Sequence, residues 1–201
     1  MQPVEDHHPD VTLVRHGETA WSRGGKHTSR TDLPLTWAGR QRAKRIGAAL
    51  AGRRFARVLT SPSLRARETC RLAGLAGQAE VREELREWDY GAYEGRTTPE
   101  IRRERPGWLL WRDGAPGGED AAAVSARADR IVRELREGTG DVAIFAHGHV
   151  LRVLGARWCE LPAEAGGALA LATAAISLLG WERERPVIVR WNVEPELLGP
   201  A

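Results

Sequence analysis

Residues 11–17 read VTLVRHG, a short β-rich apolar run that ends in a histidine and a glycine. Residues 142–148 repeat this arrangement as VAIFAHG. A glycine at the end of such a run is typical of a loop, so each run predicts a short buried strand that stops at its histidine. Ligands bind outside the carboxyl ends of the strands in open α/β sheets. We therefore expect His16 and His147 to face each other across one pocket, although a histidine taken alone is more often structural.

The rest of the chain alternates predicted strands with predicted helices. Residues 57–60 read RVLT and predict a second strand. The Ser61-Pro62 pair that follows suits a helix start, with serine as the N-cap and proline at the first helical position. Two last strands are expected near residues 174–181 and 186–193. Strands that alternate with helices predict an α/β fold with a largely parallel sheet.

The length and composition indicate an ordinary globular protein. The chain has 201 residues, which suits a single domain over residues 1–201. The net charge is +3, and nearly all basic residues are arginines. The planar fork of arginine binds two phosphate oxygens at once, although compositional bias accounts for most of these residues. Acidic residues are interleaved with the basic ones, so we expect no nucleic-acid partner.

The sequence also predicts where the protein acts. Residues 165–181 carry no charge, but this run is shorter than the roughly 20 residues of a membrane span, so it predicts a loop and a buried strand. Residues 1–10 are polar and contain no apolar stretch for a secretory signal. Cys70 and Cys159 do not make a disulfide framework in a chain of this size. We expect reduced thiols, a cytoplasmic location and no membrane association.

Five motifs occur in order along the chain. They are RHGETAW at 15–21, DLPLTxxG at 32–39, SPSLRAxxT at 61–69, LxExxxGxxEG at 85–95 and HGHxxR at 147–152. In these motifs the chain resembles the histidine phosphatase superfamily, also called the phosphoglycerate-mutase-like family, and within it the compact acid and sugar phosphatases. The resemblance implies a three-layer α/β/α sandwich with a mostly parallel central sheet, and a cap or insert at about 93–118.

The resemblance implies catalytic roles that the chemistry supports one by one. His16 would be a nucleophile that becomes transiently phosphorylated, because neutral imidazole is a good nucleophile near pH 7. Arg15 and Arg65 would clamp the phosphoryl oxygens. His147, when protonated, would bind the phosphate and stabilise developing charge. Glu87 would be the acid for the leaving alkoxide and then the base for water, which favours activity at mildly acidic pH.

A second set of groups is expected to contact the phosphate or the rest of the substrate. Gly148 would let the backbone come close to the ligand. Thr28 and Ser29 match a small polar pair that faces the phosphate in the family. Ser22 stands where the family usually has asparagine, and His149 stands where relatives vary.

Two questions about the site stay open at this point. Glu94, in the same motif as Glu87, is a rival for the acid, although the family pattern favours Glu87. Residues 97–111 are rich in arginine and tryptophan and begin with a capping-box pattern. They would form either a cap over the pocket or a packed helix.

The resulting prediction is a metal-independent, cofactor-free phosphomonoesterase of the acid phosphatase type, acting on small phosphorylated metabolites. A phosphoglycerate mutase is the alternative, but the segment between Glu87 and His147 is shorter than in the family's mutases. A zinc site at His16, Glu87, His147 and His149 is disfavoured because two clamping arginines would repel a cation. A non-catalytic protein is disfavoured because none of the key residues is lost, and homodimer formation is left open.

Overall fold

A computed structural model describes residues 8–198, so residues 1–7 of the polar N-terminal stretch lie outside it. The described chain forms one mixed sheet in the order β3-β2-β4-β1-β5-β6. The strands are β1 (Val11–Arg15), β2 (Arg57–Thr60), β3 (Ala79–Val81), β4 (Val142–Ala146), β5 (Ile176–Glu182) and β6 (Arg185–Val193). The first four strands run parallel, whereas β5 and β6 are antiparallel. The predicted α/β class and mostly parallel sheet are confirmed.

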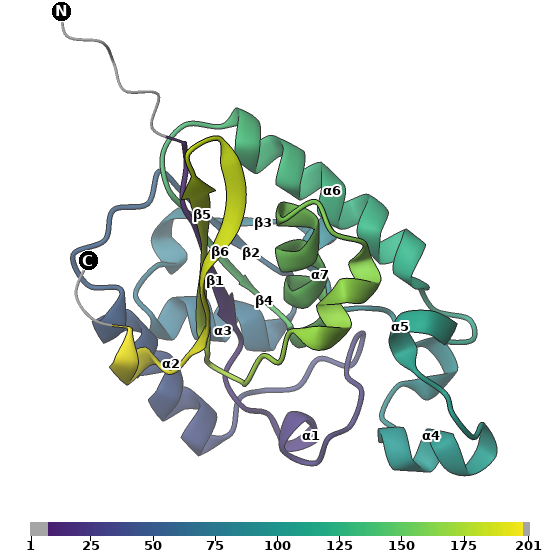
Figure 1. Ribbon diagram of the computed structural model, residues 1–201. Coiled ribbons are helices and arrows are strands. Elements are labelled where there is room, and N and C mark those ends of the chain that lie inside the picture. The colour runs from purple at the N-terminus through teal and green to yellow at the C-terminus, as the bar shows by residue number, and fades with distance from the viewer. Residues whose placement is uncertain (1–7, 199–201) are drawn as a thin grey trace, which may run out of the picture.

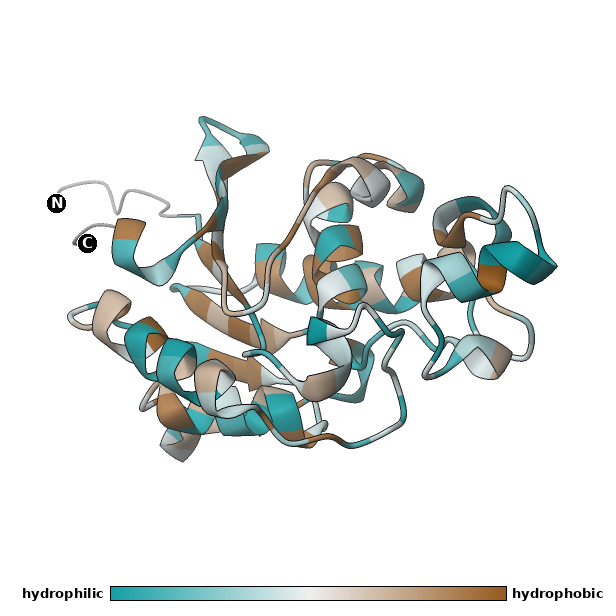
Figure 2. Ribbon diagram, turned by 90° about the horizontal axis from the view of Figure 1, so that it is seen from below, coloured by the Kyte–Doolittle hydropathy of each residue, from teal (hydrophilic) through white to brown (hydrophobic). Residues whose placement is uncertain are grey.

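Helices cover both faces of this sheet (Figure 1). They are α1 (Ala20–Arg23), α2 (Trp37–Ala49), α3 (Leu64–Leu72), α4 (Thr98–Glu104), α5 (Leu110–Asp113), α6 (Ala121–Glu137) and α7 (Gly148–Trp158). The layer of α2 and α3 shares one apolar cluster with the sheet, and the layer of α6 and α7 shares a second. Seen from below, the brown strands lie between these two helical layers (Figure 2). This is the expected three-layer sandwich.

The two strands that end in His-Gly lie at the centre of the sheet. All five residues of β4 are buried, since β2 and β1 flank the strand and helices cover both faces. β1 lies beside β4, and its first four residues are buried as well. Burial on both faces therefore explains why both strands have a continuous apolar sequence. In each strand this apolar sequence ends at the carboxyl end of the strand, next to the histidine.

The predicted start of α3 is wrong by two residues. The helix begins at Leu64 with Ser63, not Ser61, in the N-cap position, and the Ser63 side chain makes no capping hydrogen bond. Instead, the carboxylate of Asp32 accepts from the Leu64 amide at 2.7 Å. The Ser61 hydroxyl accepts from the Ser63 amide at 3.3 Å and has a further partner in the site described below.

The uncharged run at 165–181 contains the end of a 3-10 helix (Ala163–Ala168), a loop and most of the buried strand β5, so the predicted loop and strand are found after a helical turn. Within residues 8–198, no helix combines the length and the apolar character needed to cross a bilayer. Trp181 on β5 packs edge-to-face on Trp158, with ring centroids 5.3 Å apart. Both cysteines are free.

Residues 93–118 contain α4 and α5, which lie beside the main body near the carboxyl ends of the strands (Figure 1). Thr97 and Glu100 form the predicted capping box at the start of α4. Trp108 and Trp111 are buried in the larger apolar cluster. The segment is therefore anchored to the core by its tryptophans.

Candidate active site

The residues that directly follow three neighbouring strands, β1, β2 and β4, lie close together. β1 and β4 pair with Arg15 opposite Ala146, and the His16 amide donates to the Ala146 carbonyl at 2.9 Å. On the other side of β4, the Ser61 amide donates to the Phe145 carbonyl at 2.9 Å. Strand register thus brings His16, His147 and Ser61 together at the carboxyl edge of the sheet.

His16 is buried, and its tautomer is fixed by the backbone. Nδ1 lies 2.7 Å from the Gly17 carbonyl oxygen, which only accepts, so Nδ1 carries the proton and Nε2 carries the lone pair. Burial, followed by the charges of Arg65 and Arg15, holds the pKa of His16 well below its ordinary value of 6.5. The ring is therefore neutral over the physiological range and keeps a lone pair on Nε2, as a nucleophilic imidazole requires.

His147 lies next to His16, with ring centroids 5.1 Å apart. Its Nε2 lies 2.7 Å from the Ser61 hydroxyl, whereas its buried Nδ1 bonds no described residue. Burial and then Arg65 hold the pKa of His147 well below 6.5. The ring is therefore neutral in the protein without ligand, and a donating Ser61 hydroxyl leaves its proton on Nδ1.

The two arginines are held by backbone carbonyls. Arg65 is fully buried, and its terminal nitrogens donate to the carbonyls of Thr28, Ser29 and Thr31 at 3.1 to 3.3 Å. A terminal nitrogen of Arg15 donates to the Leu171 carbonyl. The Nε atoms of both arginines are buried and bond no described residue. Burial lowers the pKa of both guanidinium groups.

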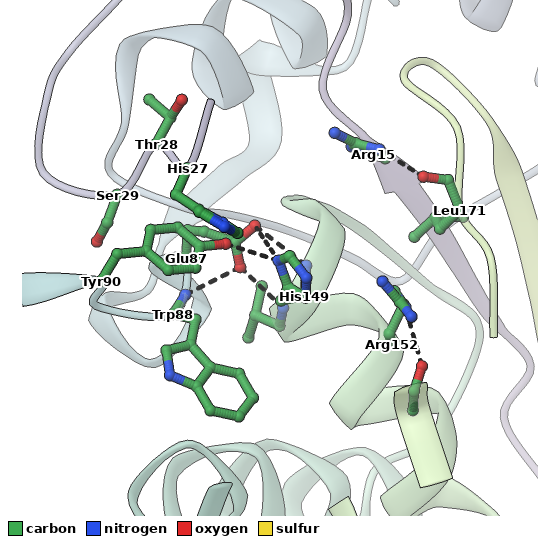
Figure 3. Close-up of polar contacts among 12 residues, drawn as sticks. Arg15, His27, Thr28, Ser29, Glu87, Trp88, Tyr90, His149, Arg152 and Leu171 are labelled. Carbon is green, nitrogen blue, oxygen red and sulfur yellow. Dashed lines mark hydrogen bonds and ion pairs between the residues drawn. The ribbon is translucent and has the colours of Figure 1, made fainter. Parts of the chain in front are cut away.

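Glu87 caps the N-terminus of α7, as the dashed lines in Figure 3 show. Its Oε1 accepts from the Trp88 and Val150 amides, both at 2.9 Å. Its Oε2 accepts only from the His149 amide, at 3.0 Å. A carboxylate oxygen has two lone pairs, so Oε2 keeps one that can carry a proton.

Tyr90 and His149 form a buried pair beside Glu87 (Figure 3). The Tyr90 hydroxyl lies 2.6 Å from His149 Nδ1. Burial raises the pKa of Tyr90 and lowers that of His149, so both groups are neutral and the phenol donates. His149 is left with a proton on Nε2. Tyr90 was missed in the sequence because only the fold brings it to this position.

These groups line a pocket of about 270 Å³. It is lined by Arg15, His16, Ser22, Gly25, Lys26, His27, Thr28, Glu87, Tyr90, Thr98, Gly148, His149, Arg152 and Leu171. Arg65 and His147 do not line it; both are buried, His147 contacts the His16 ring, and the charge of Arg65 acts on His16. Lys26, His27 and Arg152 were assigned no role from the sequence; Arg152 ends the HGHxxR motif, whereas no local pattern separates Lys26 and His27 from other polar residues.

The second set of predicted contacts is only partly brought to this pocket. Ser22 lines it, but its hydroxyl is also bonded to Thr19 in the capping box of α1. Thr28 lines it too, with its hydroxyl donating to a backbone carbonyl. Ser29 does not line it; its carbonyl accepts from Arg65. A Cβ at Gly148 would lie 3.2 Å from the Arg15 guanidinium carbon, so this glycine makes room for the arginine.

Glu94, the rival acid, does not line this pocket. Its carboxylate accepts from the Ser29 and Thr31 amides, and it thereby orders the loop whose carbonyls hold Arg65. Across residues 8–198 we find no group of three histidine, cysteine or acidic side chains arranged to hold a metal ion.

A second hollow, of about 530 Å³, lies between α2, α3 and β3. No histidine lines it, and burial raises the pKa of the Cys70 thiol in its wall to about 12. A thiol with so high a pKa is a poor nucleophile. The smaller pocket at the strand ends is therefore the candidate active site.

Comparison with known proteins agrees with this geometry. The family model of the histidine phosphatase superfamily (branch 1) matches residues 11–194. An acid phosphatase of Mycobacterium tuberculosis is 44% identical over 176 residues, covering 86% of each chain. A sedoheptulose 1,7-bisphosphatase of Saccharomyces cerevisiae is 37% identical over 186 residues, covering 76% of this chain and 68% of the relative. The solved structure of a Mycobacterium tuberculosis open reading frame has a TM-score of 0.88 at 40% identity, covering 93% of this chain and 98% of that chain.

The family match extends from the first strand into the last. The expected resemblance and fold are therefore confirmed, and the expected phosphatase activity agrees with the most similar relatives. The chain belongs to the histidine phosphatase superfamily.

Proposed function

We propose that this phosphatase hydrolyses small phosphate monoesters without a metal ion or cofactor, through a transient phosphoryl group on His16 Nε2. The observation that carries the proposal is a set of three buried nitrogens near His16 that bond no described residue. They are Arg15 Nε, Arg65 Nε and His147 Nδ1. Buried polar atoms nearly always have partners, and a phosphoryl group supplies three strong acceptor oxygens.

The first step transfers the phosphoryl group to the enzyme. The lone pair on His16 Nε2 attacks phosphorus, and the bond from phosphorus to the ester oxygen breaks. Glu87 Oε2 gives its proton to that oxygen, which leaves as an alcohol. Arg15 and Arg65 stabilise charge on the three phosphoryl oxygens, which is the main task of a protein in phosphoryl transfer.

The second step returns the enzyme to its starting state. The carboxylate of Glu87 takes a proton from water as the water oxygen attacks the phosphorus of phosphohistidine. The phosphorus–nitrogen bond breaks, inorganic phosphate leaves, and His16 regains its Nε2 lone pair. Acid–base assistance of this kind is worth about 10² to 10⁴ in rate.

Several features support the setting in which this reaction takes place. The acid phosphatase and the sugar bisphosphatase among the relatives support small phosphorylated metabolites as substrates. The free cysteines support the cytoplasm as the location. Thr98 lines the pocket while Trp108 and Trp111 anchor its segment, which supports a cap role for residues 93–118. A homodimer remains part of the proposal, to be tested by sedimentation.

The same pocket chemistry would serve a mutase that returns the phosphoryl group to a sugar acid. The short segment between Glu87 and His147 favours hydrolysis. A monophosphorylated sugar acid separates the two reactions when a small amount of its bisphosphate is added to load the enzyme: a mutase isomerises the monophosphate without releasing phosphate, whereas the proposed enzyme releases phosphate.

The proposal is tested by phosphate release from an aryl phosphate and from a panel of metabolite phosphates, at about pH 5 to 7 and with EDTA present. We expect turnover that EDTA does not affect and a loss of at least about 10³-fold in His16→Ala. His8→Ala, an exposed histidine outside the pocket, is the matched control and should keep full activity. Undiminished turnover in His16→Ala, or activity that requires zinc, would refute the proposal.

A further inference from the structure

The hollow of about 530 Å³ between α2, α3 and β3 has no part in the reaction above. Its volume lies within the ~300–1,000 Å³ of ordinary ligand pockets. None of the residues that line it also lines the catalytic pocket. The helix α3 connects the two places, because it carries the buried Arg65 of the proposed reaction and also Arg67 and Arg71 in the wall of the hollow.

Exposed apolar side chains gather at this hollow. Leu64 on α3 is 42% exposed and Val81 on β3 is 51% exposed, and both line it. Trp37, which is 76% exposed, lies one turn before Arg40 on α2, and Arg40 lines the hollow. Residues three apart are neighbours on a helix surface, so Trp37 lies at the rim. Three of the seven large apolar side chains that are exposed in the described chain therefore lie at one hollow, as is typical of a binding surface.

The polar part of the wall carries an excess of positive charge. Arg40, Arg67 and Arg71 line the hollow, and Glu68 is the only acid among its described lining residues. Three arginines and one glutamate give a net charge of +2. Arg40 Nε donates to Glu68 Oε1 at 2.7 Å, so these two charges compensate each other. The excess charge therefore belongs to Arg67 and Arg71.

Arg67 and Arg71 have no partner of their own. Both are exposed, and neither forms a hydrogen bond or an ion pair with any residue that the structure describes. They are four residues apart on α3, where like charges repel each other. An anion that contacts both guanidinium groups would remove this repulsion. The planar guanidinium suits the oxygens of a carboxylate, a sulfonate or a phosphate.

A second copy of the chain is a poor occupant for this surface. The edge strand β3 borders the hollow, but it has only three residues, and its central Glu80 pairs with Arg57 at 2.8 Å. Short edge strands and charged side chains prevent pairing with another chain. In a twofold contact, a second copy would also bring its own Arg67 and Arg71 onto this face. The charges therefore favour an anionic ligand.

We propose that this hollow binds a small organic anion, with the anionic group on Arg67 and Arg71 and an apolar body against Leu64 and Val81. The inference goes beyond the proposed function, because these residues lie outside the catalytic pocket and take no part in the reaction. Exposed ion pairs are weak by themselves, and burial of apolar surface supplies the remaining affinity. Both parts of the ligand are therefore needed.

The experiment compares two ligands that differ in one charge. Anilinonaphthalene sulfonate combines an apolar ring system with one anionic group, and its fluorescence rises on binding to apolar surface. Phenylnaphthylamine has the same rings without the sulfonate. We expect one molecule of the sulfonate to bind per chain with a Kd of about 10 to 100 μM, and the uncharged ligand to bind about tenfold more weakly.

Three substitutions in the wall should weaken binding of the sulfonate. Arg67→Gln, Arg71→Gln and Val81→Ser should each raise its Kd about two- to fivefold. Arg133→Gln, which changes an exposed arginine on α6 outside the hollow, is the matched control and should leave the Kd unaltered. Thermal denaturation should give the same Tm for all four variants, which excludes binding of the sulfonate to partly unfolded protein.

A variant of the catalytic pocket shows where the sulfonate binds. Lys26→Met removes a cation from that pocket and should leave the Kd unaltered, whereas a raised Kd would place the sulfonate there and overturn the inference. Equal affinity for both ligands, or an unaltered Kd in Arg67→Gln and Arg71→Gln, would also overturn it. So would an absence of binding, as when a second copy covers the hollow. None of these measurements involves turnover, so they stay valid if the proposed function fails.

Discussion

At the residue scale, the chemistry depends on which nitrogen of each buried histidine carries a proton. His16 Nδ1 faces a carbonyl, so Nε2 keeps its lone pair. His147 Nε2 faces the Ser61 hydroxyl, and when this hydroxyl donates, the proton of the ring lies on Nδ1. The two neutral rings, with centroids 5.1 Å apart, thus differ in what they offer a ligand: His16 offers a lone pair, and His147 offers an N–H donor.

This arrangement predicts a role for Ser61. In Ser61→Ala, His147 Nε2 loses its hydrogen-bond partner in a buried position, which lowers the free energy of unfolding by about 1–3 kcal/mol. The ring can then also adopt the tautomer with its proton on Nε2. We expect kcat/KM for an aryl phosphate to fall about tenfold, most of it in kcat. Ser125→Ala on α6, outside the pocket, is the control. Equal activity in the two variants would show that Ser61 does not orient His147.

The buried histidines also predict a pH dependence of stability. Burial and the neighbouring arginines hold the pKa values of His16, His147 and His149 well below 6.5. Above about pH 6.5 both folded and unfolded chains carry these rings neutral. As the pH falls below that value, the unfolded chain binds protons that the folded chain does not, so the free energy of unfolding falls.

The decrease should amount to as much as about 1.4 kcal/mol per pH unit for each histidine. Chemical denaturation at about pH 7.5 and about pH 5.5 measures it. Inorganic phosphate should reduce the decrease, because a bound anion favours the protonated form of His147. A free energy of unfolding that stays level between the two values would contradict the assignment of neutral buried rings.

The residues that the sequence could predict are those with a local signature. His16 and His147 follow apolar strands, and Arg65 and Glu87 stand in recognisable motifs. Ser61 was assigned to a helix cap because serine before proline usually has that role. Tyr90 has no such signature, since long-range packing alone brings it to the pocket, and the motif that ends in Arg152 did not reveal that this residue lines the pocket.

At the scale of elements, the loop after His16 packs closely against the first turn of α2. Two glycines, Gly17 and Gly39, make this close backbone contact possible. A Cβ at Gly39 would lie 2.3 Å from the Glu18 carbonyl oxygen, and a Cβ at Gly17 would lie 2.6 Å from the Gly39 carbonyl oxygen. Thr36, the N-cap of α2, also donates to the Glu18 carboxylate at 2.8 Å. Helix and loop are therefore fixed to each other next to His16.

Gly39→Ala should consequently harm stability and catalysis together. The added methyl group pushes α2 away from Glu18, which costs roughly 1–3 kcal/mol as overpacking. The shift moves His16 relative to the arginines, and we expect kcat to fall about tenfold or more. Gly77→Ala, where an added Cβ meets nothing within 4 Å, is the matched control. Thermal denaturation measures the loss of stability in both variants, and steady-state kinetics measure the loss of kcat. Full activity in Gly39→Ala would show that the contact between α2 and the loop after His16 does not support catalysis.

The strands differ in how well their position and pairing could be predicted from the sequence. β1 and β4 were predictable because continuous burial leaves a continuous apolar run. The final strands were predictable as strands, but not their antiparallel placement beside β1. Strand pairing depends on contacts between segments far apart in the chain, and no local pattern records it.

At the scale of the whole molecule, the fold gathers charged groups that the chain keeps far apart. β1, the loop at Glu87 and the start of α7 each add one part of the pocket, and α3 supplies Arg65, whose charge acts on His16. The sheet fixes these parts by register, and backbone carbonyls and amides hold Arg65 and Glu87 in place. In this phosphatase, hydrogen bonds to main-chain atoms thus fix the orientation of the Arg65 and Glu87 side chains.

The central claim, a phosphoryl group carried on His16, is tested most directly by trapping it. Wild-type and Glu87→Gln proteins are mixed with an aryl phosphate, quenched in base within the first turnovers, and analysed by intact mass and peptide mapping. An aryl leaving group needs little acid assistance, so Glu87→Gln should still be phosphorylated but slowly hydrolysed, and should accumulate the adduct. The account predicts one phosphoryl group on the peptide that contains His16. A phosphoryl group on another residue, or rapid phosphate release with no adduct in either protein, would contradict it.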